Sequence, residues 1–161
     1  MKKRQCIFFL FAIIISGSLF PCFSQESLNE QHDGKYEIGL GAGIIYDPGD
    51  YELSPGAHFH LIRKINSWLG AGLGYELTFG SHFHQCIGIM ASLTPLEWLS
   101  FDIGPSLTLP NKTNSSPELG MHTEMALTFR IKKIHLGPMI DLGIGLNDLH
   151  IASGIHLGFD L

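Results

Sequence analysis

Hydrophobic and polar residues alternate along almost the whole chain after residue 34. In WLGAGLGYELTF, residues 68–79, one parity carries the large apolar side chains, and the other carries three glycines, a glutamate and a threonine. A two-residue period is the pattern of a β-strand, whose successive side chains point to opposite faces. The pattern predicts eight strands in an all-β chain: residues 35–47, 51–63, 68–79, 81–94, 98–110, 118–131, 134–146 and 150–161.

The volumes of the two faces decide which one is inside. The apolar parity supplies about five or six large side chains per strand, whereas an eight-stranded barrel has room for few side chains in its interior. The opposite parity holds most of the 19 glycines, so it fits that narrow interior. A closed barrel also leaves no unpaired strand edge in lipid. We therefore expect an eight-stranded antiparallel up-and-down transmembrane β-barrel, with its apolar face toward lipid.

The first residues have the layout of a secretory signal peptide. Lys2, Lys3 and Arg4 precede an apolar stretch, and Cys22-Phe23-Ser24 forms a small-x-small cleavage site. We expect a signal peptide over residues 1–24, a periplasmic lead over 25–34 and the barrel over 35–161. A retained anchor and a lipoprotein at Cys22 are the alternatives. The apolar run is short for a spanning helix, and Phe20-Pro21 matches a lipobox poorly.

Removal of the signal peptide changes the charge and cysteine content. Three of the ten Lys/Arg residues leave with it, so seven remain against fifteen Asp/Glu residues. The absence of a basic stripe argues against nucleic acid as a partner. Cys86 becomes the single cysteine, which excludes an internal disulfide and cysteine-based zinc motifs.

The signal peptide, the alternating strands and the closing run HLGFDL together resemble the small outer-membrane β-barrel proteins of the OmpA/OmpX-like group, in a Gly-rich style similar to members from Bacteroidota. The resemblance implies an integral protein of the outer membrane of a Gram-negative bacterium, in contact with outer-membrane lipid and monomeric. Its last strand resembles the one that the barrel-assembly machinery recognises, although it ends on Leu161 rather than on an aromatic residue. RKINS, TPLEW and RIKKI are then the short periplasmic turns.

Two features strain the barrel prediction. Pro55, Pro105 and Pro138 lie inside predicted strands and cannot donate to a neighbour, so we expect β-bulges at these positions. Trp68 and Trp98 fall on the inward parity, so we expect them at the rim of the barrel.

Histidine is the unusual component of the predicted lumen. The inward parity carries eight of the nine histidines: His58, His60, His82, His84, His122, His135, His150 and His156. It also carries six carboxylates: Glu37, Glu76, Asp102, Glu124, Asp141 and Asp160. One interpretation is a paired polar network that keeps the barrel rigid. The other is a transition-metal site, for which the candidate ligands are His58, His60, Glu76, His82 and His84.

Register arguments place some of these residues opposite each other. A hairpin around Phe79-Gly80-Ser81 puts Glu76 opposite His84, or opposite His82 if the loop is longer. The last hairpin can put Asp141 opposite His156.

Short loops and sparse catalytic patterns limit the functions considered. The most favoured is a non-enzymatic structural or envelope-interaction barrel without a cofactor and without an open pore. Binding of a metal or small ligand in the lumen is the alternative, and a lipid-modifying enzyme is the third. For the enzyme, Ser81/His82 and His150/Ser153 are the local serine–histidine candidates.

Overall fold

A computed structural model describes residues 35–79, 83–110, 116–146 and 149–161 of the chain. Its strands are β1 Tyr36–Asp47, β2 Glu52–Lys64, β3 Leu69–Thr78, β4 His84–Leu96, β5 Leu99–Leu109, β6 Glu118–Leu127, β7 Phe129–Ile131, β8 Ile134–Gly145 and β9 Leu149–Asp160. No helix in this described part of the chain is long and apolar enough to cross a membrane. The predicted signal peptide and lead lie outside the described residues.

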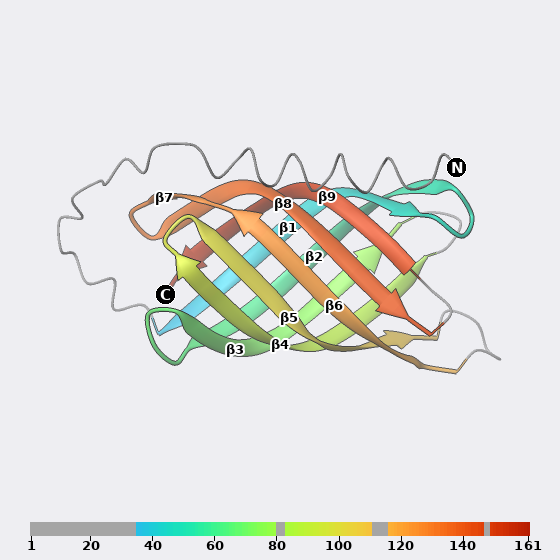
Figure 1. Cartoon of the computed structure of the whole chain (residues 1–161), viewed down its shortest axis with the longest axis horizontal. Coiled ribbons are helices and arrows are strands. Elements are labelled where there is room, and N and C mark those ends of the chain that lie inside the picture. The colour runs from blue at the N-terminus through green and yellow to red at the C-terminus, as the bar shows by residue number, and fades with distance from the viewer. Residues whose placement is uncertain (1–34, 80–82, 111–115, 147–148) are drawn as a thin grey trace, which may run out of the picture. The chain divides into compact units, whose positions relative to one another are not determined.

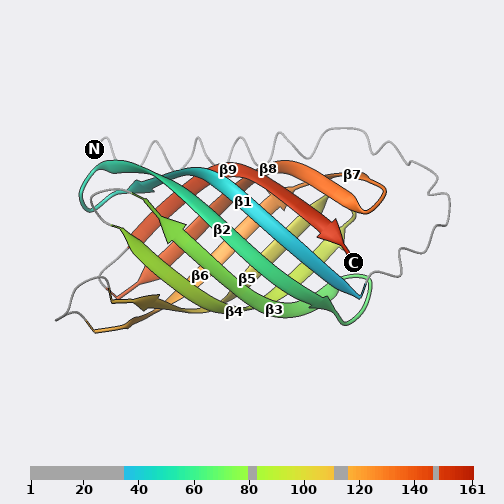
Figure 2. The same cartoon turned by 180° about the vertical axis from the view of Figure 1, so that it is seen from behind.

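The strands close into an antiparallel barrel. From β1 to β6 each strand pairs with the next, β8 pairs with β9, and β9 pairs with β1; β6 and β7 both pair with β8, which completes the ring (Figure 1). β6 and β7 are two parts of one strand that is interrupted at Thr128, so the ring has eight strands, as predicted. Figure 2 shows the same tilted strands from behind. β1 begins where β9 ends, since Glu37 pairs with Asp160. We call this the terminal end and the opposite one the loop end.

The apolar face is outside, which confirms the argument from side-chain volume. Leu40, Ile44 and Leu73 are 45%, 51% and 57% exposed, and similar residues surround the barrel on every strand. The inner face buries polar groups instead, and His60, Glu124 and His156 are each at most 2% exposed. A protein in water would not arrange its residues in this way, whereas a barrel in lipid would.

The glycines of the inner face make room for the imidazole rings. Gly39 lies opposite His60 in the β1–β2 ladder, and Gly41 lies opposite His58. A Cβ atom on Gly39 would be 1.9 Å from Nε2 of His60. Gly143 with His150 and Gly158 with His135 repeat this arrangement between β8 and β9. The glycines on the inner face of the strands therefore provide the space into which the histidine rings pack.

The prediction of bulges at the prolines is wrong. The register is unchanged across Pro105, because Gly88↔Ser106 and Ala91↔Ile103 have the same offset on either side of it. Instead, Gly104 and Pro105 have no paired residue in the β4–β5 ladder. A Cβ on Gly104 would be only 1.8 Å from the carbonyl oxygen of Ile89, so the small residue beside the proline lets the strands stay close.

Pro138 and Pro55 are also accommodated without a shift of register. Pro138 pairs with Ile155 on one side, and on its other side lies the interruption of the strand at Thr128. Pro55 lies beside the end of β3, where its carbonyl oxygen accepts a hydrogen bond from the backbone N–H of Phe79 at 2.8 Å. The register shift that the β4–β5 ladder does contain lies between Leu93 and Leu96.

The two tryptophans belong to turns at the terminal end. Trp68 immediately precedes β3 and Trp98 precedes β5, and both are about half exposed. The side-chain oxygen of Asn66 accepts hydrogen bonds from the backbone N–H groups of Trp68 at 3.0 Å and Leu69 at 2.8 Å. This Asx-type turn ends the alternation before Trp68, so the expected position at the rim is confirmed.

Candidate functional site

The described part of the lumen holds three groups of charged and imidazole side chains. The terminal-end cluster comprises Glu37, Lys64, Arg130 and Asp160. The middle cluster comprises His58, His60, Glu124 and His156, and the loop-end cluster comprises Glu76, His122, Asp141 and His150. In each of the last two clusters, one potential ligand atom from every residue lies within 4.8 Å of the other three.

The terminal-end cluster pairs its carboxylates with permanent cations. Nζ of Lys64 lies 2.6 Å from Oδ1 of Asp160 and 3.8 Å from Oε2 of Glu37. Arg130 donates to the other oxygen of Asp160. Lys64 and Arg130 are partly exposed, whereas the side chain of Asp160 is 1% exposed. The two cations thus reach inward from the rim and balance the two carboxylates of this end.

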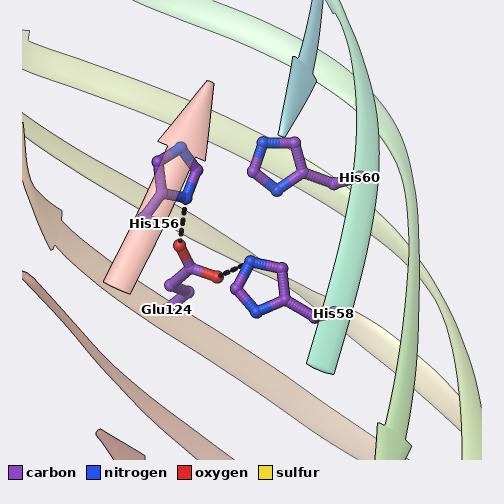
Figure 3. Close-up of side chains that lie close together, drawn as sticks. All are labelled: His58, His60, Glu124 and His156. Atoms are coloured by element: carbon purple, nitrogen blue, oxygen red, sulfur yellow. Dashed lines mark hydrogen bonds and ion pairs between the residues drawn. The ribbon is translucent and has the colours of Figure 1, made fainter. Parts of the chain in front are cut away.

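The middle cluster gathers three imidazole rings around one carboxylate (Figure 3). Nε2 of His58 lies 3.0 Å from Oε2 of Glu124, and Nδ1 of His156 lies 3.0 Å from Oε1. β2 contributes His58 and His60, β6 contributes Glu124 and β9 contributes His156. The rings of His60 and His156 are stacked with their centroids 5.2 Å apart. Each carboxylate oxygen of Glu124 thus contacts one imidazole ring, and the third ring, that of His60, contacts neither oxygen.

His60 is that third ring. It is 1% exposed, and neither of its ring nitrogens has a hydrogen-bond partner among the described residues. Oε1 of Glu37 lies 3.6 Å from Nε2, and Oδ2 of Asp102 lies 3.7 Å from Nδ1. Both distances are too long for a hydrogen bond. Burial of an imidazole whose nitrogens make no hydrogen bond costs free energy of folding, so a further polar group or ion that binds His60 would stabilise the site.

The loop-end cluster is arranged differently. His122 lies between two carboxylates, with Nδ1 3.2 Å from Oε2 of Glu76 and Nε2 2.9 Å from Oδ2 of Asp141. Nε2 of His150 lies 3.3 Å from Oε1 of Glu76. An imidazole can donate from both nitrogens only in its protonated, positively charged form. A charged His122 therefore bridges two negative groups in this cluster.

The predicted metal ligands are divided between these clusters. His58 and His60 lie in the middle cluster, and Glu76 lies in the loop-end cluster. His84 lies beside Glu76, with its Nε2 4.0 Å from Oε1 of Glu76 and 3.0 Å from Oγ1 of Thr78. His82 lies outside the described residues. The five residues therefore do not form one group.

Both predicted cross-strand pairs are wrong. Glu76 lies opposite Cys86, because the ladder of β3 and β4 starts at Thr78↔His84 and the loop is longer than the three-residue turn assumed. Asp141 lies opposite Ala152 and His156 lies opposite Gly137, because Ile144↔Leu149 is the last pair before the turn. Some carboxylate–imidazole contacts join neighbouring strands diagonally, such as His122 with Asp141, whereas others cross the lumen, such as His58 with Glu124.

Glu124 and His156 were not among the predicted ligands. Alternation places both on the inner face, but it does not say which strands face each other across a barrel. That depends on the stagger between strands and on the tilt that follows from it. The paired spacing His58-x-His60 was the available signal, and it identified one half of the middle cluster.

Two small cavities lie beside these clusters in the described part of the barrel. A cavity of about 20 Å³ lies between the middle and loop-end clusters, and its lining includes His58, His60, Glu76, His122 and Glu124. A second cavity, of about 10 Å³, lies beside Glu76 and Asp141. Volumes of this size hold about one water-sized group each. The clusters therefore fill the lumen at these levels.

The serine–histidine candidates for catalysis do not form a pair where the structure describes them. His150 is buried on the inner face, while Ser153 is exposed on the outer face. Ser81 and His82 lie outside the described residues. A nucleophile and its base must lie within hydrogen-bond reach, so His150 and Ser153 do not meet that requirement.

The fold is that of a small eight-stranded outer-membrane β-barrel, and comparisons with solved structures support this class. Neisserial surface protein A matches with a TM-score of 0.56 at 9% identity, over 78% of this chain and 96% of that one. The de novo designed protein TMB2.3 matches with a TM-score of 0.50 at 11% identity, over 80% of this chain and 94% of that one. At such identities the likeness shows the fold alone.

A third solved structure, the attachment invasion locus protein Ail of Yersinia pestis, matches with a TM-score of 0.49 at 12% identity, over 77% of this chain and 95% of that one. No family model matches the chain, and no curated protein does. The outer-membrane class is defined by the architecture of the closed barrel.

Proposed function

We propose that the protein is a monomeric, non-enzymatic barrel of the Gram-negative outer membrane with a structural or envelope-interaction role. The observation that carries this proposal is the combination of an apolar exterior with a filled polar interior. Side chains such as Leu40 and Ile44 suit contact with lipid, while the buried Glu124 of β6 lies 3.0 Å from His58 of β2, on the opposite side of the ring. Cross-links of this kind hold opposite walls of the barrel together.

The filled lumen supports a rigid barrel rather than a channel. A conducting channel needs a continuous water-filled path, whereas the two cavities beside the middle and loop-end clusters, of about 20 Å³ and about 10 Å³, each have room for about one water. Eight-stranded barrels generally have an interior that side chains fill. Interaction with other envelope components would then use the outer surface and the loops.

Four measurements, two on purified protein and two on cells, test the proposal. Folded protein is expected to migrate differently on a gel before and after boiling, and to fractionate with the outer membrane of cells that express it. In planar lipid bilayers it is expected to give no conductance steps. Lipid A from cells with and without the protein is expected to have the same composition.

Each measurement addresses a separate part of the proposal. Identical mobility before and after boiling would contradict the barrel. Stable conductance steps would contradict the closed lumen. An altered acylation pattern of lipid A that depends on the protein would replace the structural role with a lipid-modifying activity.

A further inference from the structure

The middle cluster has the composition of a metal site, and the ring nitrogens of its central imidazole, His60, make no hydrogen bond within the described residues. We propose that His58, His60, Glu124 and His156 bind one divalent transition-metal ion of the zinc class inside the barrel. This goes beyond the proposed function, because a structural barrel needs no metal.

The donor set selects the class of ion. Three imidazole nitrogens and one carboxylate oxygen form a four-ligand set of the kind that binds Zn²⁺ tetrahedrally. Calcium and magnesium take oxygen ligands and would leave the three rings unused. Imidazole also suits nickel, cobalt and copper, which makes Co²⁺ a usable optical probe of the same site.

The positions of the ligand atoms need little change. Four-coordinate zinc with bonds of about 2.0–2.1 Å holds its ligand atoms about 3.3–3.4 Å apart. Glu124 already lies 3.0 Å from both His58 and His156, and all four ligand atoms fall within 4.8 Å of each other. The ligands are held on strands of a closed barrel, so the remaining gap is closed by rotation of side chains.

The neighbours of the cluster can orient the ligands. Nε2 of His156 is hydrogen-bonded to Nε2 of His135 at 3.3 Å, which leaves Nδ1 directed at the cluster. When one nitrogen of His60 binds the ion, the other can donate to Glu37 or Asp102, the carboxylates 3.6 Å and 3.7 Å away. Partners of this kind fix the ring orientation of metal-bound histidines.

Charge balance favours the same ion. Glu124 and Asp102 are 2% and 4% exposed, and the ion pairs of Glu124 in the described part of the chain are with the imidazoles of His58 and His156. Buried carboxylates need compensating positive charge. A divalent cation among neutral imidazoles would balance Glu124 and Asp102 together, and it would bind a ring nitrogen of His60 that makes no hydrogen bond in the described part of the chain.

The test uses the full-length mature barrel, refolded in detergent with Co²⁺ and then freed of excess metal. We expect one equivalent of cobalt by elemental analysis, the visible absorption of tetrahedral cobalt, and loss of that absorption on addition of Zn²⁺. His60→Gln and Glu124→Gln are expected to weaken cobalt binding by more than about 100-fold, since loss of even an outer partner of a ligand costs 10–100-fold.

Matched variants at the loop-end cluster separate a site from a general effect on folding. His122→Gln, and the milder His84→Gln, change the same residue type in the same lumen and are expected to retain one equivalent of cobalt. A gel of unheated and boiled samples shows which variants are folded, so this assay also separates the barrel from the metal site. Folded wild-type protein without cobalt would overturn the proposal. So would cobalt that is lost in folded His122→Gln but kept in folded His60→Gln.

Discussion

The middle and loop-end clusters use the same two residue types in different proportions. In the loop-end cluster, two carboxylates accompany His122 and His150, and His122 reaches both at 2.9 Å and 3.2 Å. In the middle cluster, one carboxylate accompanies three imidazoles, and the flanking carboxylates lie 3.6 Å and 3.7 Å from His60. In the loop-end cluster every imidazole lies within 3.3 Å of a carboxylate oxygen, whereas in the middle cluster His60 lies farther than that from both flanking carboxylates.

This difference indicates that the ratio of imidazoles to carboxylates decides whether a buried cluster is completed by a proton or by a metal ion. With two carboxylates, a protonated imidazole completes the cluster and holds the walls of the barrel together. With one carboxylate already engaged by His58 and His156, a further ring needs a different acceptor. A metal ion accepts electron pairs from several neutral imidazoles at once, which an additional proton cannot do.

Removal of the shared carboxylate in the loop-end cluster gives the largest expected effect. Glu76→Ala is expected to lower the free energy of unfolding by about 3–5 kcal/mol, because it leaves a charged His122 with one partner in a buried position. The midpoint temperature at which the unheated gel band disappears measures the loss. Bound cobalt is expected to stay at one equivalent, because Glu76 is not a ligand.

Glu97 is the matched control for that change. It is an exposed glutamate in the turn between β4 and β5, so Glu97→Ala is expected to change the stability by no more than about 0.5 kcal/mol. Equal stability of the two variants would show that the loop-end cluster does not hold the barrel together. The contrast between the two clusters would then fail.

A smaller loss of stability is expected when a side chain is added at the glycine that packs against a ring of the middle cluster. In Gly39→Ala the new Cβ would be 1.9 Å from Nε2 of His60, so the ring must move. Such overpacking is expected to cost about 1–3 kcal/mol and to weaken cobalt binding. Thermal unfolding and cobalt titration of the same sample measure the two effects.

Gly74→Ala sharpens this result because Gly74 lies opposite His60 on the other side, in the β2–β3 ladder. A Cβ there meets the flexible end of Met90 at 2.8 Å and no imidazole. We expect a smaller loss of stability and unchanged cobalt binding. If both variants lose cobalt equally, the position of the His60 ring is not what the glycine controls.

Alternation was enough to predict the fold. Leu40 and Ile44 lie on the apolar parity of β1 and Leu73 on that of β3, and the narrow interior of an eight-stranded barrel leaves no room for so many bulky groups. The closed ring, the eight strands and the outward apolar face all follow from that argument. Local sequence did not show how prolines would be accommodated, because the outcome depends on how closely a neighbouring strand approaches Gly104.

The candidate site could be predicted only in part. His58 and His60 are two residues apart on one strand, so a local pattern places them together. Glu124 and His156 join them through the stagger of a closed barrel, which no short stretch of sequence contains. The pairing of Glu76 with His84 failed for a related reason, since one uncertain loop length moves the partner of Glu76 to Cys86.

The terminal-end cluster provides the last and smallest prediction, because it uses permanent cations. Lys64→Met is expected to cost about 1 kcal/mol or less, since Lys64 is 27% exposed and Arg130 still pairs with Asp160. Lys133→Met, at an exposed turn position, is expected to have no measurable effect.

The double variant Lys64→Met/Arg130→Met tests why both cations are present. The side chain of Asp160 is 1% exposed, so without either cation it becomes a buried charge, and the double variant is expected to lose more stability than the two single variants together. Thermal midpoints of the four proteins give this coupling. Simple additivity would mean that Lys64 and Arg130 act independently of each other, and the idea that they share the charge of Asp160 would then fail.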